Sequence, residues 1–321
     1  MKVAVIRFSS LGDVILTTAV IEALYENNIK PTFITLDSFS SLFEKDYRLD
    51  NVIYTNRQQL KSLKDIKNFA KNLSSFDLIL DLHANLRSFL VSFFSGVKTI
   101  RYDKKSIQRR LLTKPFFKNF LNLKNFSVVN AYLETLKILN IKNLEKYRPK
   151  VIIDENDKPN IEIPQNFIAI GTGARYKGKM YPYYLDVINL LKEKGFNIVL
   201  LGSKEDIEKD ENVYKGVLDL RGKLTIRQSL YVLSKAKLTI SNDSAIAHMS
   251  RAVNTKVLMI YGATHPYFGF YPFKDEGDYL FANLPCQPCD LHGKKECKFN
   301  DYRCFKEIEP NLVMEKALSL L

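Results

Sequence analysis

Polar residues between Thr239 and Pro266 are of types, and stand at positions, that could hold a phosphate. Residues 241–244, Ser-Asn-Asp-Ser, follow an apolar run, and such residues often cap helix N-termini. A second apolar run, 256–261, ends in Gly-Ala-Thr at 262–264. In an open α/β sheet, ligands bind at the carboxyl ends of the strands, and a helix N-terminus favours an anion. The segment therefore predicts a phosphate or diphosphate site.

A carboxylate follows the first apolar run of the chain, where it could act on a ligand. Residues 3–7 predict a strand and residues 14–25 an amphipathic helix, with Gly12 and Asp13 in the turn between them. The turn contains neither G-x-G-x-x-G nor G-x-x-x-x-G-K-[ST], so it is neither a dinucleotide fingerprint nor a P-loop. Asp13 is either a favourable aspartate at a helix start or a carboxylate that faces a ligand.

Further polar groups stand at other predicted strand ends. Residues 81–88 include His83 and Arg87, which in such a loop are often structural hydrogen-bonding residues and here are also candidates for ligand binding. In the second half, Gly171-Thr172-Gly173 and Gly202 each follow an apolar run. With nearby lysines, these features fit a second mononucleotide-binding half, although a glycine pair alone often only makes a tight turn.

The positive charge of the chain is concentrated in its first half. The net charge is +13; residues 1–150 hold 25 Lys+Arg against 13 Asp+Glu, and residues 151–321 hold 23 against 22. This asymmetry predicts that the first half meets something acidic. Residues 98–124 are the most basic, with one acid and nine basic residues: Lys98, Arg101, Lys104, Lys105, Arg109, Arg110, Lys114, Lys118 and Lys124. They could bind an anionic membrane or nucleic acid, or form a solvated basic helix; no nucleic-acid-binding motif accompanies them.

Strands and helices alternate along the whole chain, which predicts doubly wound parallel sheets. In the first half, strand-like runs occupy 32–36, 52–54, 78–82 and 99–101, a helical pattern covers 58–73, and a short strand is predicted at 151–153. The length of 321 residues favours two domains, with a polar linker at 154–164. We expect domains at 1–155 and 156–321. No apolar run is long enough to span a membrane and no signal peptide is recognisable, so we expect a cytoplasmic protein.

The four cysteines lie close together near the C-terminus. Cys286 and Cys289 form a C-x₂-C pair, and Cys297 and Cys304 follow with a gap of six residues between them. This spacing is compatible with a structural metal site, but it is not that of a standard zinc ribbon. Disulfides and free or redox-active thiols are the alternatives, and a cytosolic location argues against stable disulfides.

Five segments together resemble glycosyltransferase family 9, the ADP-heptose:lipopolysaccharide heptosyltransferases. They are residues 7–14, 81–88, 173–182, 242–248 and 261–266, so the resemblance covers nearly the whole chain. It implies a GT-B fold, in which two Rossmann-like domains face each other across a cleft. It also implies transfer of heptose from ADP-heptose, with inversion and without a catalytic cofactor, to the lipopolysaccharide inner core at the inner membrane. The expected location is therefore peripheral to that membrane, with no role for nucleic acid.

The resemblance also assigns roles to residues. Asp13 would be the catalytic base, and the C-terminal domain would bind the nucleotide sugar. The expected donor-binding residues are Ser9, Ser10, Gly12, Thr172, Gly173, Lys179, Gly202, Asp243, Ser244, His248, Gly262 and Thr264. The expected acceptor-binding residues are His83, Arg87, Arg101, Lys104 and Lys105. Asp243 is expected to order its turn rather than touch phosphate, because two anions repel.

The chain departs from the family pattern at four positions. Tyr181 replaces Trp, Ala245 replaces Gly, Ala263 replaces Pro and His265 replaces Asp. The last two lie beside the expected donor contacts, so a different nucleotide sugar or acceptor is the closest alternative. A noncatalytic basic module that binds membranes or nucleic acid through residues 98–124, and an epimerase of the same fold, are more distant alternatives.

Overall fold

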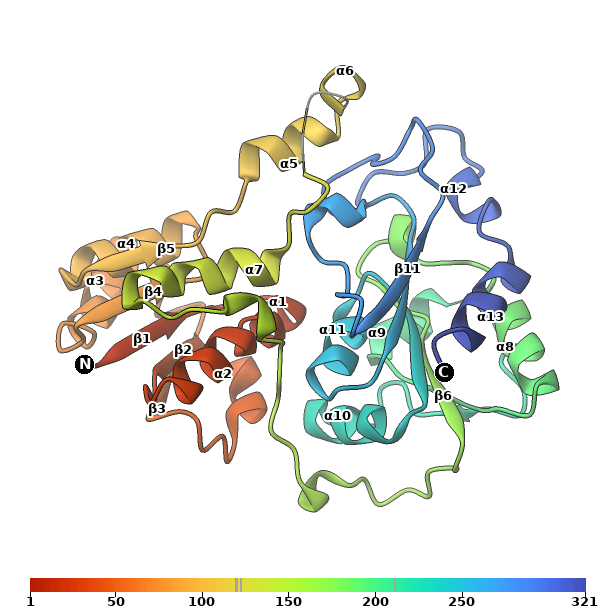
Figure 1. The fold of residues 1–321 in the computed structure, drawn as a ribbon, viewed down its shortest axis with the longest axis horizontal. Coiled ribbons are helices and arrows are strands. Elements are labelled where there is room, and N and C mark those ends of the chain that lie inside the picture. Colours follow the sequence, from red (N-terminus) through yellow and green to blue (C-terminus); the bar gives the residue numbers. More distant parts are fainter. Residues whose placement is uncertain (119–120, 122, 211) are drawn as a thin grey trace. The chain divides into compact units, whose positions relative to one another are not determined.

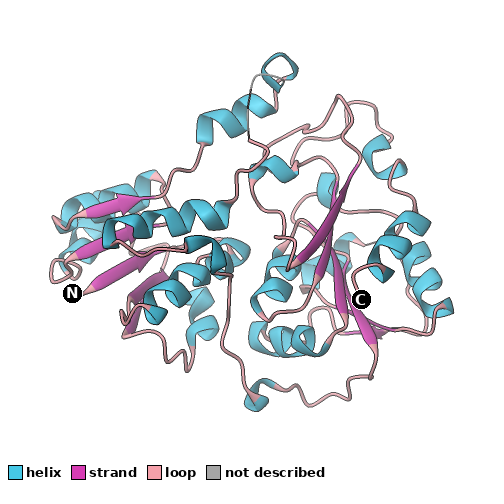
Figure 2. Ribbon diagram, viewed as in Figure 1, coloured by secondary structure: helices cyan, strands magenta, loops and turns pink. Residues whose placement is uncertain are grey.

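The computed structural model describes residues 1–118, 121, 123–210 and 212–321. The chain divides into two compact units, each with its own parallel sheet (Figures 1 and 2). Unit 1 comprises Met1–Lys104 and Val128–Ile152, and unit 2 comprises Lys105–Ser127 and Ile153–Leu321. The basic segment thus divides between them, and Phe120, with the other undescribed positions of residues 98–124, lies outside the described residues.

Unit 1 is a doubly wound sheet with the strand order β3-β2-β1-β4-β5. Its strands are β1 (Val3–Ile6), β2 (Thr32–Leu36), β3 (Asn51–Thr55), β4 (Leu78–Asp81) and β5 (Thr99–Arg101). Its helices are α1 (Leu11–Leu16), α2 (Thr18–Glu26), α3 (Leu63–Lys71), α4 (Leu86–Ser95) and α7 (Val128–Leu133), with 3-10 turns η1 (Asp37–Phe43), η2 (Glu134–Leu139) and η3 (Leu144–Lys146). Ile6 and Ile79 of the sheet pack with Phe69 of α3 and Val91 of α4 in one core.

Unit 2 repeats the plan with the strand order β11-β10-β9-β6-β7-β8, again all parallel. Its strands are β6 (Phe167–Gly171), β7 (Asn197–Leu200), β8 (Leu218–Asp219), β9 (Leu238–Asn242), β10 (Val257–Tyr261) and β11 (Gly277–Phe281). Its helices are α5 (Ser106–Leu112), α6 (Pro115–Lys118), α8 (Tyr184–Glu193), α9 (Lys204–Lys209), α10 (Ile226–Lys235), α11 (Ala245–Ala252), α12 (Arg303–Lys306) and α13 (Pro310–Leu318), with 3-10 turns η4 (Glu155–Asp157), η5 (Lys177–Lys179) and η6 (Pro266–Phe268).

Both faces of the second sheet are covered, which explains why every residue of β6, β9 and β10 is buried. Val187 of α8 and Val313 of α13 pack with Ile240 and Ile260 in one core. On the other face, Ala247 of α11 packs with Met259 and neighbouring residues of β10. No described helix is long and apolar enough to cross a membrane.

Three predicted elements differ from the structure for local reasons. The single helix expected at 14–25 is divided at Thr17, whose hydroxyl donates to the carbonyl of Val14 at 2.6 Å. The helix expected from residue 58 begins only at Leu63, because Ser62 and Asp65 form a capping box there. Residues 151–153 form no strand.

Candidate active site

Asp13 lies in the first turn of α1, at the carboxyl end of β1, with three polar partners. Arg7 Nη2 is 2.7 Å from Asp13 Oδ2, and the Ser10 hydroxyl donates to the same oxygen at 2.9 Å. The Tyr132 hydroxyl donates to Oδ1 at 3.3 Å. The Asp13 side chain is 20% exposed, so a ligand can reach it. An adjacent guanidinium favours the ionised carboxylate, which is the form that a general base requires.

Arg7 is buried beneath Asp13 and is fixed by its own hydrogen bonds. Its Nη1 donates to the carbonyl of Leu82 at 2.6 Å and to the Tyr132 hydroxyl at 3.0 Å. Burial opposes the charge, but the Asp13 carboxylate and the neighbouring Tyr132 raise the pKa of Arg7 above its usual value. Arg7 is therefore a permanent cation next to the candidate base, a role that the sequence analysis did not assign.

His83 follows β4, which is the neighbour of β1 in the sheet. Burial lowers the pKa of His83 to about 3, and the positive charges of Arg7 and Lys104 add to this effect. Its ring packs edge-on against Phe8 at a centroid distance of 5.5 Å. Its Nδ1 is buried without a hydrogen-bond partner among the described residues. The neutral ring thus brings an unused polar atom near Asp13, with which it interacts electrostatically.

The other predicted acceptor residues occupy different positions. Arg101 Nε lies 3.0 Å from Asp81 Oδ2, its guanidinium also donates to the Ser92 hydroxyl, and it stacks 4.6 Å from the ring centre of Phe89. Arg101 is therefore engaged within unit 1. Arg87 is exposed on α4. Lys104 and Lys105 precede α5, and Lys105 adopts a left-handed backbone at the N-cap of that helix.

Ser9, Ser10 and Gly12 belong to the same β1–α1 turn as Asp13, in unit 1. The Ser9 carbonyl accepts a hydrogen bond from Arg7 Nε at 2.6 Å, and Gly12 is buried. All the other predicted donor residues lie in unit 2. The structure therefore describes the predicted donor site as two groups, one in each unit.

In unit 2, the side chain of Asn242 connects the turns that carry the predicted donor residues. Its Nδ2 donates to the carbonyls of Thr172 and Gly173, at 2.8 and 3.2 Å. Its Oδ1 accepts from the Tyr181 backbone N–H at 3.0 Å and from the Tyr184 hydroxyl at 3.1 Å. Asn242 is fully buried and thus fixes the β6 turn and the segment after Lys179 to the end of β9.

Lys179 and Asp243 form the charged centre of this unit. Lys179 Nζ is 2.7 Å from Asp243 Oδ2, and the Thr264 hydroxyl donates to the same oxygen at 3.2 Å. Burial opposes ionisation of Asp243, but Lys179 and His248 hold its pKa below the ordinary range. The predicted ordering role of Asp243 thus has a concrete form: it positions Lys179 and Thr264.

Ser244 and His248 lie on α11. Ser244 is the N-cap of this helix, and its hydroxyl lies 3.0 Å from that of Ser241 rather than on a backbone N–H of the first turn. Those N–H groups thus lack a side-chain cap, as an anion site at a helix N-terminus requires. His248 is buried, with Nδ1 3.4 Å from Arg251 Nη1.

The remaining predicted residues lie where other parts of unit 2 pack closely against the backbone or the side chain. The Thr172 hydroxyl accepts from Arg221 Nη1 at 3.1 Å. A Cβ on Gly173 would meet the Asp206 carboxyl carbon at 2.0 Å, and one on Gly202 would lie 2.9 Å from an oxygen of that carboxylate. A Cβ on Gly262 would lie 2.1 Å from the ring of Phe305. These glycines are thus explained by packing alone.

The four cysteines are free thiols in the structure. Among the described residues, no group of three or more His, Cys, Asp or Glu side chains is arranged to hold a metal ion. Burial raises the pKa of Cys304 to about 12, and the nearby Cys289 and Cys286 contribute to this shift. The thiols are thus close enough to interact, but the structure gives the predicted metal site no support.

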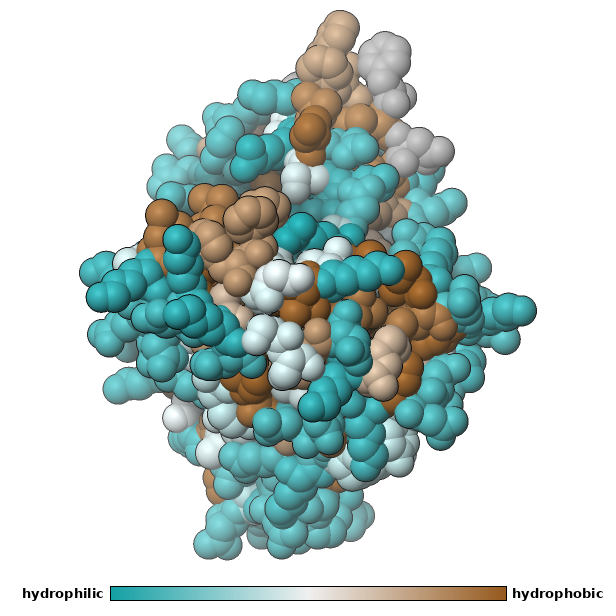
Figure 3. Space-filling model, turned by 90° about the vertical axis from the view of Figure 1, so that its left-hand side faces the viewer, coloured by the Kyte–Doolittle hydropathy of each residue, from teal (hydrophilic) through white to brown (hydrophobic). Residues whose placement is uncertain are grey.

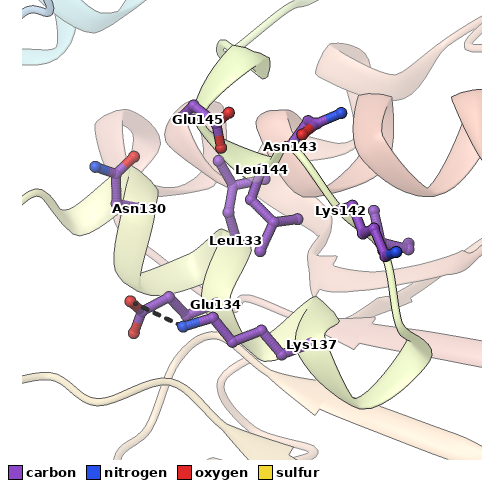
Figure 4. A pocket seen from close by; sticks show the side chains of 9 residues that line it. Asn130, Leu133, Glu134, Lys137, Lys142, Asn143, Leu144 and Glu145 are labelled. Carbon is purple, nitrogen blue, oxygen red and sulfur yellow. Dashed lines mark hydrogen bonds and ion pairs between the residues drawn. The ribbon is translucent and has the colours of Figure 1, made fainter.

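A cavity of about 450 Å³ lies in unit 1, beside α7, η2 and η3 (Figure 4). Leu133, Ile141 and Leu144 line it, and Glu134 and Lys137 form an ion pair of 3.4 Å in its wall. None of the predicted site residues lines it.

Comparisons with known proteins agree with the fold and the motifs. The family model "Glycosyltransferase family 9 (heptosyltransferase)" matches residues 66–302. Lipopolysaccharide heptosyltransferase 3 of Escherichia coli is 26% identical over 282 residues, which cover 80% of this chain and 82% of that protein. A family 9 glycosyltransferase from Veillonella parvula superposes with a TM-score of 0.78 at 18% identity, over 99% of this chain and 96% of that one. The E. coli heptosyltransferase WaaC, solved with ADP-2-deoxy-2-fluoro heptose, gives a TM-score of 0.68 at 18% identity, over 98% of each chain.

Two Rossmann-like units define a glycosyltransferase of the GT-B fold. Asp13 lies at a strand end of one unit, and Lys179, paired with Asp243, lies at the strand ends of the other. The chain belongs to glycosyltransferase family 9, the heptosyltransferases. The solved structures, at 18% identity, support the fold alone.

Proposed function

We propose that this protein transfers heptose from ADP-heptose, with inversion, to the inner core of lipopolysaccharide. The observation that carries the proposal is the Asp13 carboxylate, which lies 2.7 Å from the Arg7 guanidinium while one-fifth of its side chain remains exposed. The relatives named as lipopolysaccharide heptosyltransferases support the choice of donor and acceptor.

In the proposed step, the Asp13 carboxylate takes the proton of an acceptor hydroxyl as its oxygen attacks the anomeric carbon. The bond between that carbon and the diphosphate oxygen breaks, and ADP leaves with the electron pair. A single displacement inverts the anomeric configuration. Tyr132 and Ser10 hold the carboxylate in position during the step.

The departing ADP gains negative charge, which unit 2 is suited to stabilise. Lys179 supplies a positioned ammonium, and the first turn of α11 after Ser244 supplies backbone N–H groups. Thr264 adds a hydroxyl beside them. We assign His83, Arg87, Lys104 and Lys105 to the acceptor, whose carboxylates and phosphates suit the excess positive charge of the first half.

Replacement of Asp13 with Asn tests the proposal. The side chain keeps its size but cannot accept the proton, so we expect transfer to fall by about 10²–10⁴-fold. Calorimetry should give an unchanged affinity for ADP. Turnover of the D13N variant at the wild-type rate would overturn the assignment of the base.

The identity of the donor is tested separately, because the chain departs from the family pattern in unit 2. Ala245 opens α11 without a positive φ, and His265 is buried, with Nδ1 accepting from the Tyr267 backbone N–H at 3.1 Å. Both residues thus have local structural roles. Calorimetry with ADP-heptose and with UDP and GDP sugars should show binding of the ADP sugar only. Binding of a UDP or GDP sugar instead would mean that the protein uses a different donor.

Two further assignments complete the proposal. The protein acts in the cytoplasm at the anionic inner-membrane surface, where its acceptor is anchored. For the four cysteines, Cys286, Cys289, Cys297 and Cys304, the proposal of a structural metal ion is based on their spacing alone, because their thiols are not arranged as metal ligands in the structure. Mass spectrometry of the purified protein that finds no metal in a fully folded sample would remove this last assignment.

A further inference from the structure

Helix α4 has an exposed apolar stripe in addition to the residues that it presents to the core. Val91 is fully buried in the core of unit 1, and Leu90 and Phe94 pack against that core. Ser88, Ser92 and Ser95 are also buried, at 0, 2 and 7% exposure. Leu86, Phe89 and Phe93 are 74, 42 and 65% exposed. A helix that covers a sheet normally exposes polar residues, so this outward apolar stripe requires an explanation.

The buried serines fix this orientation. The Ser88 hydroxyl donates to Asp81 Oδ2 at 3.0 Å, and it also forms a capping box with Asn85 at the start of the helix. The Ser92 and Ser95 hydroxyls donate to the carbonyls of Ser88 and Ser92, at 3.0 and 2.7 Å. Rotation of the helix would bury the aromatic rings only by removing the Ser88 hydrogen bond from Asp81 and by withdrawing Val91 from the core. The exposure of the apolar stripe is therefore built into unit 1.

Leu86, Phe89 and Phe93 recur at spacings of three and four residues, so they form one ridge along the helix. The rings of Phe89 and Phe93 stack at 6.0 Å, and Phe94 adjoins Phe93 at 5.4 Å. The side of the molecule that includes unit 1 has an apolar patch bordered by hydrophilic side chains (Figure 3). We call these three residues, with Phe94, the aromatic ridge.

Positive charge borders the aromatic ridge. The Arg101 guanidinium lies 4.6 Å from the ring centre of Phe89, and Lys67 Nζ lies 4.9 Å from that of Phe94. Arg87 and Lys98 are exposed at the two ends of the helix. Residues 82–102 contain no Asp or Glu. Exposed aromatic rings with lysine and arginine around them match the interfacial zone and anionic headgroups of a bilayer.

We propose that the aromatic ridge docks unit 1 onto an anionic phospholipid bilayer, with the rings at the acyl boundary and the cations on the headgroups. This assigns the membrane contact to α4, and of the basic residues 98–124 that the structure describes, only Lys98 and Arg101 border it. It rests on the proposed function only in that the acceptor is lipid-anchored. Vesicle binding itself requires neither donor nor acceptor, so the two ideas can fail separately.

The test is co-sedimentation with vesicles of phosphatidylcholine, with and without phosphatidylglycerol. Phe89→Ser with Phe93→Ser should weaken binding to the mixed vesicles at least about tenfold. Lys67→Glu with Lys98→Glu should weaken binding to the mixed vesicles and leave binding to pure phosphatidylcholine unchanged. Phe299→Ser is the matched control, because Phe299 is also 42% exposed and also stacks under a cation, Arg303, at 3.7 Å. It should bind like the wild type.

Three results would overturn the proposal. The first is a wild-type protein that does not bind anionic vesicles, and the second is a double serine variant that binds them as the wild type does. The third is a dimer that depends on the ridge, without vesicle binding, which would mean that a second copy covers the ridge. Thermal melting and ADP calorimetry establish that each variant is folded. Transfer to a soluble, delipidated acceptor reports on the proposed function alone, and the ridge variants should retain it.

Discussion

Lys179 Nζ lies 2.7 Å from Asp243 Oδ2, so the cation that we propose for the diphosphate is held by a carboxylate that is itself buried. The arrangement resolves an apparent conflict, because an aspartate beside the proposed phosphate site would repel the ligand. The Lys179 ammonium balances the charge of Asp243, and the Thr264 hydroxyl donates a hydrogen bond to the same carboxylate. The ammonium is thereby presented in one orientation.

Replacement of Lys179 with Met should weaken ADP binding by about 10–100-fold, the value of one or two charge-assisted hydrogen bonds. Isothermal titration calorimetry measures the change. Lys177→Met is the control, because Lys177 is two residues away but exposed, and it should bind ADP normally. Equal affinities of both variants would remove Lys179 from the donor site.

The lowered pKa of Asp243 predicts a pH dependence of stability. A carboxyl whose pKa is lower in the folded state stabilises the protein above its unfolded value of about 3.9. That contribution disappears as the pH falls through the folded value. Urea unfolding should be measured from about pH 6 to about pH 3, a range that includes the unfolded pKa. Over this range, the free energy of unfolding should fall more for the wild type than for Asp243→Asn. Parallel curves would contradict the ion pair.

Tyr132→Phe should lower the rate of transfer more than it lowers stability. The substitution removes the hydroxyl that accepts from Arg7 and donates to Asp13. We expect a loss of about 1 kcal/mol in unfolding free energy and a fall in kcat of about tenfold from looser positioning of the carboxylate. Tyr147→Phe removes the hydroxyl of another buried tyrosine, which accepts from Asn27, and it should affect stability only. Similar kinetics for both variants would argue against the role of Tyr132.

His83 also predicts a loss of stability as the pH falls, but in a higher pH range than Asp243. Because the folded pKa is about 3, whereas an unfolded histidine titrates near 6.5, the unfolded state binds the extra proton. Stability due to neutral His83 is therefore present above about pH 6.5 and is lost progressively below it. In His83→Gln, the free energy of unfolding should depend less on pH between pH 7 and pH 5, an interval of about two pH units that includes the unfolded pKa. An unchanged slope would mean that another group titrates there.

The architecture could be predicted from the sequence because its signals are local. Runs such as 3–6 and 257–260 are apolar throughout, as is typical of strands covered on both faces, and the polar residues that follow such runs suggested Asp13 and Asp243. The class of ligand followed from the same signals, since strand ends and helix starts favour anions.

The supporting residues could not be predicted, because their roles depend on contacts between distant parts of the chain. Tyr132 meets Asp13 across 119 positions, and Asn242 meets Tyr181 across 61. No spacing rule relates such pairs. Arg101 shows the same limit: its charge suggested an acceptor contact, which stays a prediction, but the sequence did not reveal its ion pair with Asp81. The metal arrangement suggested by the cysteine spacing likewise depends on side-chain directions that spacing does not fix.

Asp81 has one further consequence. Its carboxylate accepts from the Ser88 hydroxyl of α4 and from the backbone N–H of His83 and Ala84, so the aromatic ridge and the turn beside Asp13 share one anchor. With the ridge at the bilayer, this anchor would set the height of the base above the lipid. Acceptor hydroxyls at that distance from the membrane would then be the ones that reach the base.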